Sequence, residues 1–340
     1  MAFTVVGSSP GQMDKLEVCE ELDTWGVKAT GTYIAIPYDD FSILPENDAK
    51  VEEKATGSRY SLYVVTTKQD VRGTLVMQVW PDTVTLAHDM CGMVRTAAIA
   101  SIPADYPSSY SMRWFNKADG NTYMITGARP DVARLTVSEG DPILKMSIDF
   151  IAKSFALDTA GDGADTTTDA TLPSGDAFQM SDMGLWWNPA VITAADNVAE
   201  EEETAIEELT IELRQNLRAG GKRDRASGFE KTITRLDAGV VDAEISGSIA
   251  MHGDQSARAW DYMDYVISKN TGFALGVKFN YPGTGSPVDI FTYTIRNLVM
   301  RKVDPPSSIR EVKVMRFNGI VEATAVSTAP VVFTSGTWTS

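Results

Sequence analysis

The two halves of the sequence carry the same run of elements. Residues 73–77 read Gly-Thr-Leu-Val-Met, and residues 247–251 read Gly-Ser-Ile-Ala-Met. Each run is followed by a helix-like stretch, by further strands, and by an Asp-Pro pair (Asp141-Pro142 or Asp304-Pro305) that leads into another alternating strand. A unit of roughly 150 residues used twice gives a chain with internal pseudo-symmetry. Such a chain can supply two quasi-equivalent positions to a closed ring. The repeat therefore favours a protein that assembles with other copies over an enzyme.

The length of the chain suits two such units. With 340 residues, each half is long enough to bury a core. Hydrophobic residues make up 43% and charged residues 22%, which excludes disorder over most of the chain. We therefore expect a first domain over residues 1–157, an acidic linker or loop over 158–176, a second domain over 177–325, and a C-terminal tail over 326–340.

The charge balance limits the partners that the chain can hold. Thirty basic and 46 acidic side chains leave a formal charge of −16. Because affinity for DNA comes mainly from Lys and Arg, this balance disfavours a protein that grips nucleic acid. It suits a protein that stays soluble, or one that passes a nucleic acid without holding it.

The sequence also bears on the compartment. It has no run of about 18 or more apolar residues, so no membrane insertion is expected. The N-terminus lacks the basic start and long apolar core of a secretory signal. The two cysteines, Cys19 and Cys91, are expected to be free thiols. These features predict a protein that is made and folded in a cytoplasm.

Strand patterns dominate the sequence. Apolar and polar residues alternate in many short runs, a spacing that is typical of half-buried antiparallel strands. Other runs are rich in aromatic and β-branched residues, which favour strands. We expect strands at residues 32–36, 60–65, 75–79, 144–150, 209–213, 290–295 and 312–317.

Each half also contains one helix signal. In the first half, Pro81 and Asp82 suit the first turn of a helix, and Gly92 suits its end. In the second half, Asp254 is a good N-cap and precedes an apolar stripe at helical spacing that includes Trp260. We interpret both stripes as core-facing, so each half is predicted to be a β-sandwich or partly rolled sheet with one packed helix.

Two charged segments are too long for plain hairpin turns. They cover residues 39–57 and 218–228, and the second concentrates basic residues in an otherwise acidic chain. Either segment is an arm that reaches beyond its own domain or an ordinary flexible tip, and the repeat favours the arm. The residues that we expect at contacts between subunits or rings are Lys50, Glu52, Glu53, Lys222, Arg223 and Arg225.

Two acidic runs are interpreted as exposed segments rather than as metal sites. The aspartates that begin at residue 158 lack the terminal Glu of an EF-hand loop, so an exposed loop is preferred to a calcium site. The run at residues 200–203 is expected to be an exposed turn or the start of a helix.

No catalytic pattern emerges. Neither His88 nor His252 has the neighbours of a zinc site, no Gly-x-Ser-x-Gly motif occurs, and residues 220–223 lack the spacing of a phosphate loop. Trp186-Trp187 is either a sugar-stacking platform or a packing anchor, and packing is preferred. We predict no enzyme activity, no cofactor and no metal.

Nine positions mark the order of turns, strands and helices along the chain. Together with residues 209–216 and 317–322, they occur in an order that resembles the bacteriophage tail tube proteins with a duplicated domain, over about residues 20–325. The nine positions are Trp25, Gly26, Gly73, Pro81, Asp82, Gly92, Gly247, Asp254 and Trp260.

The resemblance implies a mainly β fold of two tandem tail-tube-type domains, each a β-sandwich or barrel-forming unit with one packed helix. It implies that neighbouring subunits join their inner sheets into a β-barrel around a lumen, that the rings stack into a tube, and that long loops and arms lock one ring to the next. A duplicated unit implies trimeric rings of pseudo-sixfold symmetry, with a true hexamer as the alternative.

The function implied is that of a structural subunit of the tail tube, a hollow conduit for DNA passing to the host. The expected partners are other copies of the chain, the tape measure protein, the tail terminator and baseplate proteins, and double-stranded DNA that passes without specific binding. The expected location is the virion tail, after assembly in the host cytoplasm. An acidic bore would repel phosphates, and the basic arm at Lys222, Arg223 and Arg225 would dock on an acidic surface of the adjacent ring.

Two alternatives stay open. One is another phage tail, baseplate or capsid decoration protein. The other is a carbohydrate-acting β-protein that uses paired carboxylates and Trp186-Trp187.

Overall fold

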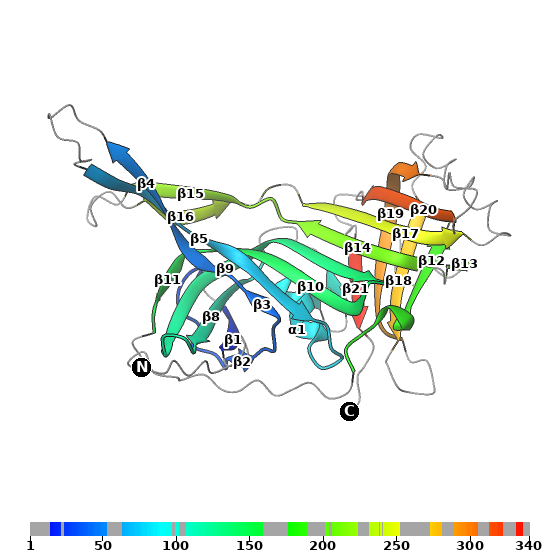
Figure 1. Cartoon of the computed structure of the whole chain (residues 1–340), viewed down its shortest axis with the longest axis horizontal. Helices are drawn as coiled ribbons and strands as arrows, with labels where there is room; N and C mark the ends of the chain where they lie inside the picture. Colours follow the sequence, from blue (N-terminus) through cyan, green and yellow to red (C-terminus); the bar gives the residue numbers. More distant parts are fainter. Residues whose placement is uncertain are drawn as a thin grey trace, which may run out of the picture.

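The described chain is built almost wholly of strands. Its pairings are all antiparallel, and the molecule is elongated, with the first half at one end and the second half at the other (Figure 1). The predicted mainly β class is confirmed. The structure is a computed structural model, and it describes residues 14–21, 24–52, 63–96, 99–101, 107–158, 176–188, 201–203, 206–223, 231–237, 239, 241–251, 273–280, 289–304, 313–321 and 331–335.

The first half contributes eleven of the described strands and the helix α1. The elements are β1 (Lys15–Glu21), β2 (Ile34–Ala35), β3 (Asp40–Phe41), β4 (Leu44–Glu52), β5 (Tyr63–Gln78), α1 (Val84–Met90), β6 (Val94–Thr96), β7 (Ile99–Ser101), β8 (Ser109–Asn116), β9 (Asn121–Ser138), β10 (Asp141–Ala152) and β11 (Ser154–Leu157).

The second half contributes the remaining described strands and a short 3-10 helix (Met180–Asp182). The strands are β12 (Met183–Asn188), β13 (Glu201–Glu203), β14 (Ile206–Arg214), β15 (Arg218–Arg223), β16 (Lys231–Asp237), β17 (Asp242–Met251), β18 (Phe273–Asn280), β19 (Asp289–Asp304), β20 (Lys313–Val321) and β21 (Val331–Ser335).

Two layers of strands enclose the core of the first half. The inner layer has the order β4-β5-β10-β9. The outer layer has the order β2-β1-β8-β9-β11. The long strand β9 belongs to both layers, because its beginning pairs with β8 and β11 and its end pairs with β10.

The second half repeats this pairing strand for strand. The order β14-β17-β20-β19 matches the inner layer of the first half. The order β13-β12-β18-β19-β21 matches its outer layer. The long strand β19 therefore takes the place of β9. The repeat in the sequence is thus a repeat in strand pairing, whereas the expected domain boundaries stay a prediction.

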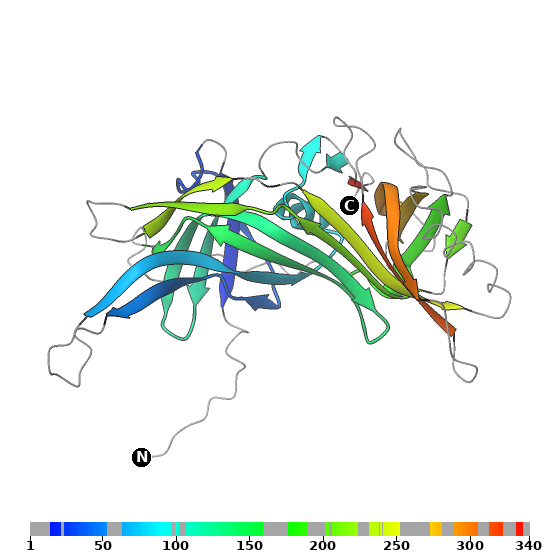
Figure 2. The same ribbon diagram turned by 90° about the horizontal axis from the view of Figure 1, so that it is seen from above.

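The halves join through both layers. In the inner layer, β9 pairs with β14 from Ser138↔Glu208 to Val132↔Arg214. In the outer layer, the last strand β21 pairs with β7 of the first half. Figure 2 shows the inner strands of the two halves running side by side across this boundary. One curved sheet therefore passes from one end of the molecule to the other.

The two glycines of the repeat occupy matching positions in this sheet. Gly73 lies opposite Phe150, and Gly247 lies opposite Phe317. A Cβ atom on Gly73 would lie 2.2 Å from the carbonyl oxygen of Ser42, and one on Gly247 would lie 2.6 Å from that of Glu208. Both positions need glycine because the neighbouring backbone leaves no room for a side chain.

The predicted first helix is confirmed. Pro81 and Asp82 lie in the turn that precedes α1, and the helix ends at Met90. Gly92 follows with φ +82°, the left-handed conformation that ends many helices. The second predicted helix, with Asp254 and Trp260, lies outside the described residues.

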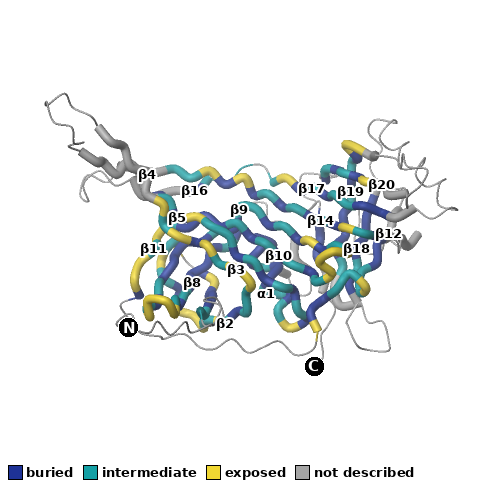
Figure 3. The backbone as a smooth tube through the Cα atoms, in the orientation of Figure 1, coloured by how far each residue is buried: buried dark blue, intermediate teal, exposed yellow. Residues whose placement is uncertain are grey.

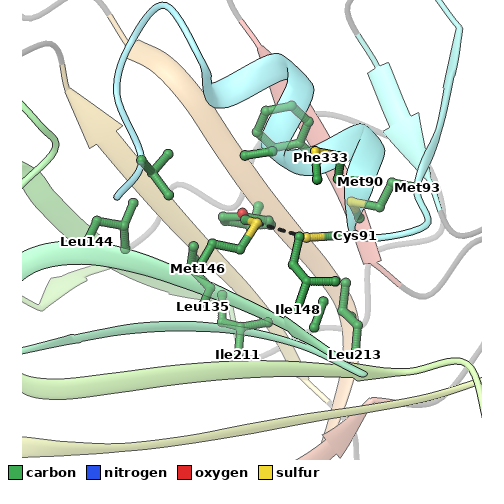
Figure 4. Close-up of a cluster of buried hydrophobic side chains, with 14 of the residues drawn as sticks. Met90, Cys91, Met93, Leu135, Leu144, Met146, Ile148, Ile211, Leu213 and Phe333 are labelled. Atoms are coloured by element: carbon green, nitrogen blue, oxygen red, sulfur yellow. Dashed lines mark hydrogen bonds between the residues drawn. The ribbon is translucent and has the colours of Figure 1, made fainter. Parts of the chain in front are cut away.

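The helix packs beneath the inner sheet. Figure 4 shows Met90, Cys91 and Met93 against side chains of the inner strands, with Phe333 of β21 beside them. Buried apolar residues of both halves form one continuous cluster, and Figure 3 shows buried positions along strands of both halves. The alternation expected at residues 75–79, 144–150 and 209–213 is confirmed, because every second residue, from Leu75, Leu144 and Leu209 onward, is at most 6% exposed.

Two local expectations were wrong, and both long charged segments contain strands. Only Ile34–Ala35 of the predicted strand at residues 32–36 is a strand. The acidic run at Glu201–Glu203 is neither turn nor helix but the strand β13, because pairing with β12 overrides its low strand propensity. Within the charged segment at residues 218–228, Arg218–Arg223 is a strand that pairs with β16. Within the charged segment at residues 39–57, Leu44–Glu52 is the strand β4, which pairs with β5.

Candidate assembly surfaces

The inner sheet has one apolar face and one polar face. The apolar face covers the core, and the polar side chains alternate with it along each strand. Across the strands the polar face carries charges of both signs. The described charged residues that alternate with the core residues are Asp70, Arg72, Lys145, Asp149, Arg134, Glu208, Glu212, Arg214, Asp242, Glu244 and Arg316.

Ion pairs connect these charges from strand to strand. Arg134 on β9 lies 2.9 Å from Asp149 on β10 and 3.1 Å from Glu212 on β14. Glu212 also contacts Arg214, with 2.5 Å between Oε1 and Nε, and Arg214 lies 3.3 Å from Glu244 on β17. The hydrogen bonds raise the pKa of Arg134 against the opposing effect of burial. The polar face is therefore a network in which Glu212 holds two guanidinium groups and crosses the boundary between the halves.

Two hairpins extend from one end of the inner sheet. One is formed by β4 and β5, and the other by β15 and β16 (Figure 1). In the repeat of strand pairing, the successive strands β14 and β15 correspond to β4. The successive strands β16 and β17 correspond to the long strand β5. The second hairpin bends away at Asn216, whose φ is +51°, and Gly239 packs against that residue because a Cβ there would lie 2.5 Å from its carbonyl oxygen.

A small apolar cluster fixes the second hairpin. Leu217, Ile233 and Leu236 pack with Ile151 of β10, and Trp25 lies at the edge of this cluster. The N–H of Leu217 donates to the carboxylate of Asp131 on β9, with 2.7 Å between the atoms. The base of the hairpin is thus tied to the first half of the chain.

Four of the six predicted contact residues lie on these hairpins. Lys50 and Glu52 lie in β4, and Lys222 and Arg223 lie in β15. Glu53 and Arg225 lie outside the described residues. The strands β15 and β16 carry five basic residues and one acidic residue, whereas β4 and β5 carry four acidic residues and three basic residues. The second hairpin is therefore strongly basic, whereas the charges of the first nearly balance.

The inner and outer layers leave pairing edges at both ends of the molecule. Within the described residues, β4 pairs only with β5, and β11 pairs only with β9. At the far end, residues 299–304 of β19 pair only with β20 among the described strands. Figure 1 places β4 and β11 at one end and β19 and β20 at the other. These edges are open to pairing with another chain.

Comparison with known protein families gives a match. The family model described as "Phage tail tube protein" matches residues 16–338. The chain belongs to the phage tail tube family. None of the curated proteins searched matches it. Membership gives this tail tube protein a structural role in the virion tail, where members self-assemble into a tube with other tail components.

The signature pair Trp25-Gly26 is held by a residue that the sequence analysis missed. The carboxylate of Glu21 is only 9% exposed. It accepts hydrogen bonds from the N–H groups of Gly26 and Gly127, at 2.8 and 2.7 Å, and from the hydroxyls of Ser109 and Ser111, at 2.9 and 2.8 Å. These four donors satisfy a buried charge and fix the loop to the outer sheet. A Glu in an alternating strand carries no signal of this role.

Trp25 itself links the loop to β9. Its indole N–H donates to the carbonyl of Gly127, at 2.9 Å, and Lys153 lies with its ammonium 5.1 Å from the ring centroid. The ammonium of Lys153 also donates to the carbonyl of Trp25, at 3.2 Å. The tail tube signature at this position is therefore a packing feature of the first half.

His88 and the two cysteines are buried in the described structure. His88 of α1 is 1% exposed, stacks on Phe333 and forms a hydrogen bond with the Tyr293 hydroxyl, so it joins the helix of the first half to strands of the second. Both cysteines are buried free thiols, as expected, and burial raises the pKa of both Cys19 and Cys91.

In the part of the chain that the structure describes, no group of three or more His, Cys, Asp or Glu side chains is placed to hold a metal ion. Among the described residues, no helix has the length and apolar character needed to span a membrane. His252 lies outside these residues, and Trp186-Trp187 lies in β12, which pairs with β18 and β13.

Proposed function

We propose that three copies of this tail tube protein close into a pseudo-sixfold ring, and that stacked rings form the conduit through which DNA passes. The observation that carries the proposal is the β9–β14 pairing, which joins two equivalent halves into one sheet. The same junction can form between chains if the end of β19 pairs with β4 of the next copy. The two edges lie at opposite ends of the molecule, as a head-to-tail ring requires.

The polar face would line the channel. Two of its arginines, Arg134 and Arg214, contact carboxylates, which makes them less available to the phosphates of a passing duplex. The described residues of this face carry nearly equal numbers of acidic and basic side chains, so pairing of charges rather than a uniformly acidic bore accounts for weak binding. DNA would pass without specific contacts.

The hairpins would connect successive rings. The basic hairpin, with Lys222 and Arg223 in β15 and with Arg225, would contact an acidic surface of the adjacent ring. The β4–β5 hairpin, with Lys50, Glu52 and Glu53, would contribute charges of both signs. Charge complementarity of this kind sets register and orientation between partners.

Mass measurement and electron microscopy test the ring. The expected particle has three times the chain mass of 37.0 kDa and shows an axial hole in negative stain. A particle of six chains would favour the hexamer, and a compact particle without a hole would favour another phage component. Monomers over the whole concentration range would contradict the ring. The family match favours a tail tube over a carbohydrate-acting protein.

Charge reversal tests the hairpin contact separately. Replacing Lys222, Arg223 and Arg225 by Glu should leave rings intact and shorten or abolish tubes. A control that exchanges Lys and Arg at the same positions keeps the charge and should keep the tubes. Unchanged tube lengths for the reversed variant would reject the contact.

A further inference from the structure

The outer layer contains a second junction between the halves. The strand β21 of the second half pairs with β7 of the first half at Val332↔Ser101, Phe333↔Ala100 and Thr334↔Ile99. In the strand-pairing repeat, β11 is the counterpart of β21, because each lies beside the first part of the long strand shared by both layers. The counterpart in the first half therefore has no strand from the described chain on its outer edge.

The exposure of the two counterparts differs accordingly. In β21, where β7 covers the edge, Val331 and Phe333 are 0% exposed. In β11, Ser154 and Ala156 are exposed and Leu157 is 46% exposed, although the strand has the apolar sequence Ser-Phe-Ala-Leu. Edge strands that face solvent are normally protected by charge, proline or a bulge, and β11 itself contains no charged residue or proline.

Its neighbours hold β11 in place. Phe155 stacks on Tyr123 of β9, with 5.0 Å between ring centroids. Just after the strand, the N–H of Asp158 donates to the carbonyl of Thr122, at 2.8 Å, and the carboxylate of Asp158 lies 3.2 Å from the ammonium of Lys28. The strand is therefore ordered before a partner arrives, which lowers the conformational cost of pairing.

We propose that β11 is a second seam between neighbouring chains, and that its partner is the second half of another copy of this protein. The partner segment would be residues 252–272, which follow β17 and precede β18 in the sequence as β6 and β7 follow β5 and precede β8. The proposed contact of β4 with the next chain and this contact of β11 would then lie at the same end of the molecule. In the same way, the junctions β9–β14 and β7–β21 lie at one boundary inside the chain. This inference rests on the proposed ring.

Substitutions at exposed positions test the seam. The double variant Ala156→Lys and Leu157→Lys adds two charges to β11 without burying them. The matched control is Ile34→Lys, because Ile34 is 52% exposed and lies on β2 at the opposite edge of the same outer layer. Both proteins are first checked for an unchanged melting temperature as dilute monomers.

The readout is the concentration at which rings dissociate, followed by mass photometry in a fixed concentration of urea. Loss of about three residue pairs at each interface should weaken the ring at least about tenfold in the β11 variant and less than about twofold in the control. Equal dissociation of the β11 variant, the control and the wild type would overturn the seam while leaving the ring intact. Failure of the wild type to form rings would instead contradict the proposed function.

Hydrogen exchange on the wild type gives a second measurement. The amides of residues 155–157 should exchange more slowly in rings than in dilute monomers. Equal exchange in both states would also overturn the seam. This result does not depend on whether the lysine variant folds.

Discussion

The buried carboxylate of Glu21 permits a prediction about stability. The substitution Glu21→Gln keeps the size of the side chain but turns one acceptor oxygen into an NH2 donor. Each oxygen of Glu21 accepts from one backbone N–H and one serine hydroxyl. The serine hydroxyl can rotate to accept a hydrogen bond, whereas the backbone N–H cannot. One backbone N–H group therefore faces the new NH2 group of the glutamine, and neither group can accept a hydrogen bond.

The size of the effect follows from these bonds. An unsatisfied buried donor costs about 1–3 kcal/mol, and the other bonds weaken because they lose the charge of their acceptor. We expect a loss of about 3 kcal/mol in the free energy of unfolding. With an unfolding entropy of about 2.1 cal/mol/K per residue over 340 residues, this loss lowers the melting temperature by about 4 °C.

Thermal unfolding of dilute protein, followed by circular dichroism, measures this shift. The matched control is Glu20→Gln, because Glu20 is the neighbouring residue, has the same charge and is exposed. The control should melt within about 1 °C of the wild type, since exposed substitutions change stability little. If Glu21→Gln also melts within 1 °C of the wild type, the carboxylate does not hold the Trp25-Gly26 loop.

Two further predictions concern the inner sheet. Gly247→Ala should cost about 2–3 kcal/mol in calorimetry, because its Cβ meets backbone at 2.6 Å, whereas Gly140→Ala should cost nothing because no atom lies within 4 Å of its Cβ; equal melting temperatures would contradict the close approach. Glu212→Gln removes the carboxylate shared by two arginines, so rings of this variant should retain a short DNA duplex at low salt in a filter assay and release it as salt rises. Glu208→Gln, an exposed change on the same strand, is the control, and equal retention by the two variants would show that paired charges do not limit DNA binding.

Much of the fold was predictable because its determinants are local. The alternation at residues 144–150 and 209–213 directly reports which side chains face the core. The Pro81-Asp82 pair and Gly92 predicted the first helix because each acts within one turn. The repeated glycines marked matching positions, since the same close approach of backbone recurs in each half.

The rest depended on contacts between distant residues. Nothing in the alternation of β9 shows that its end pairs with β14, because side-chain spacing carries no information about the neighbouring strand. Glu21 and Ser111 lie far apart in sequence, so their hydrogen bond leaves no local signal. The acidic strand Glu201–Glu203 was missed because its pairing with β12 outweighs its composition.

The β9–β14 junction bears on how readily a ring can form. In a ring of three such chains, every second joint between half-units is already made within a polypeptide. Only two encounters in solution precede closure, instead of the five that six separate half-units need, so less translational and rotational freedom is lost. Because the two halves have different sequences, the outside of such a ring would also repeat every third of a turn, and a companion protein could recognise three positions rather than six.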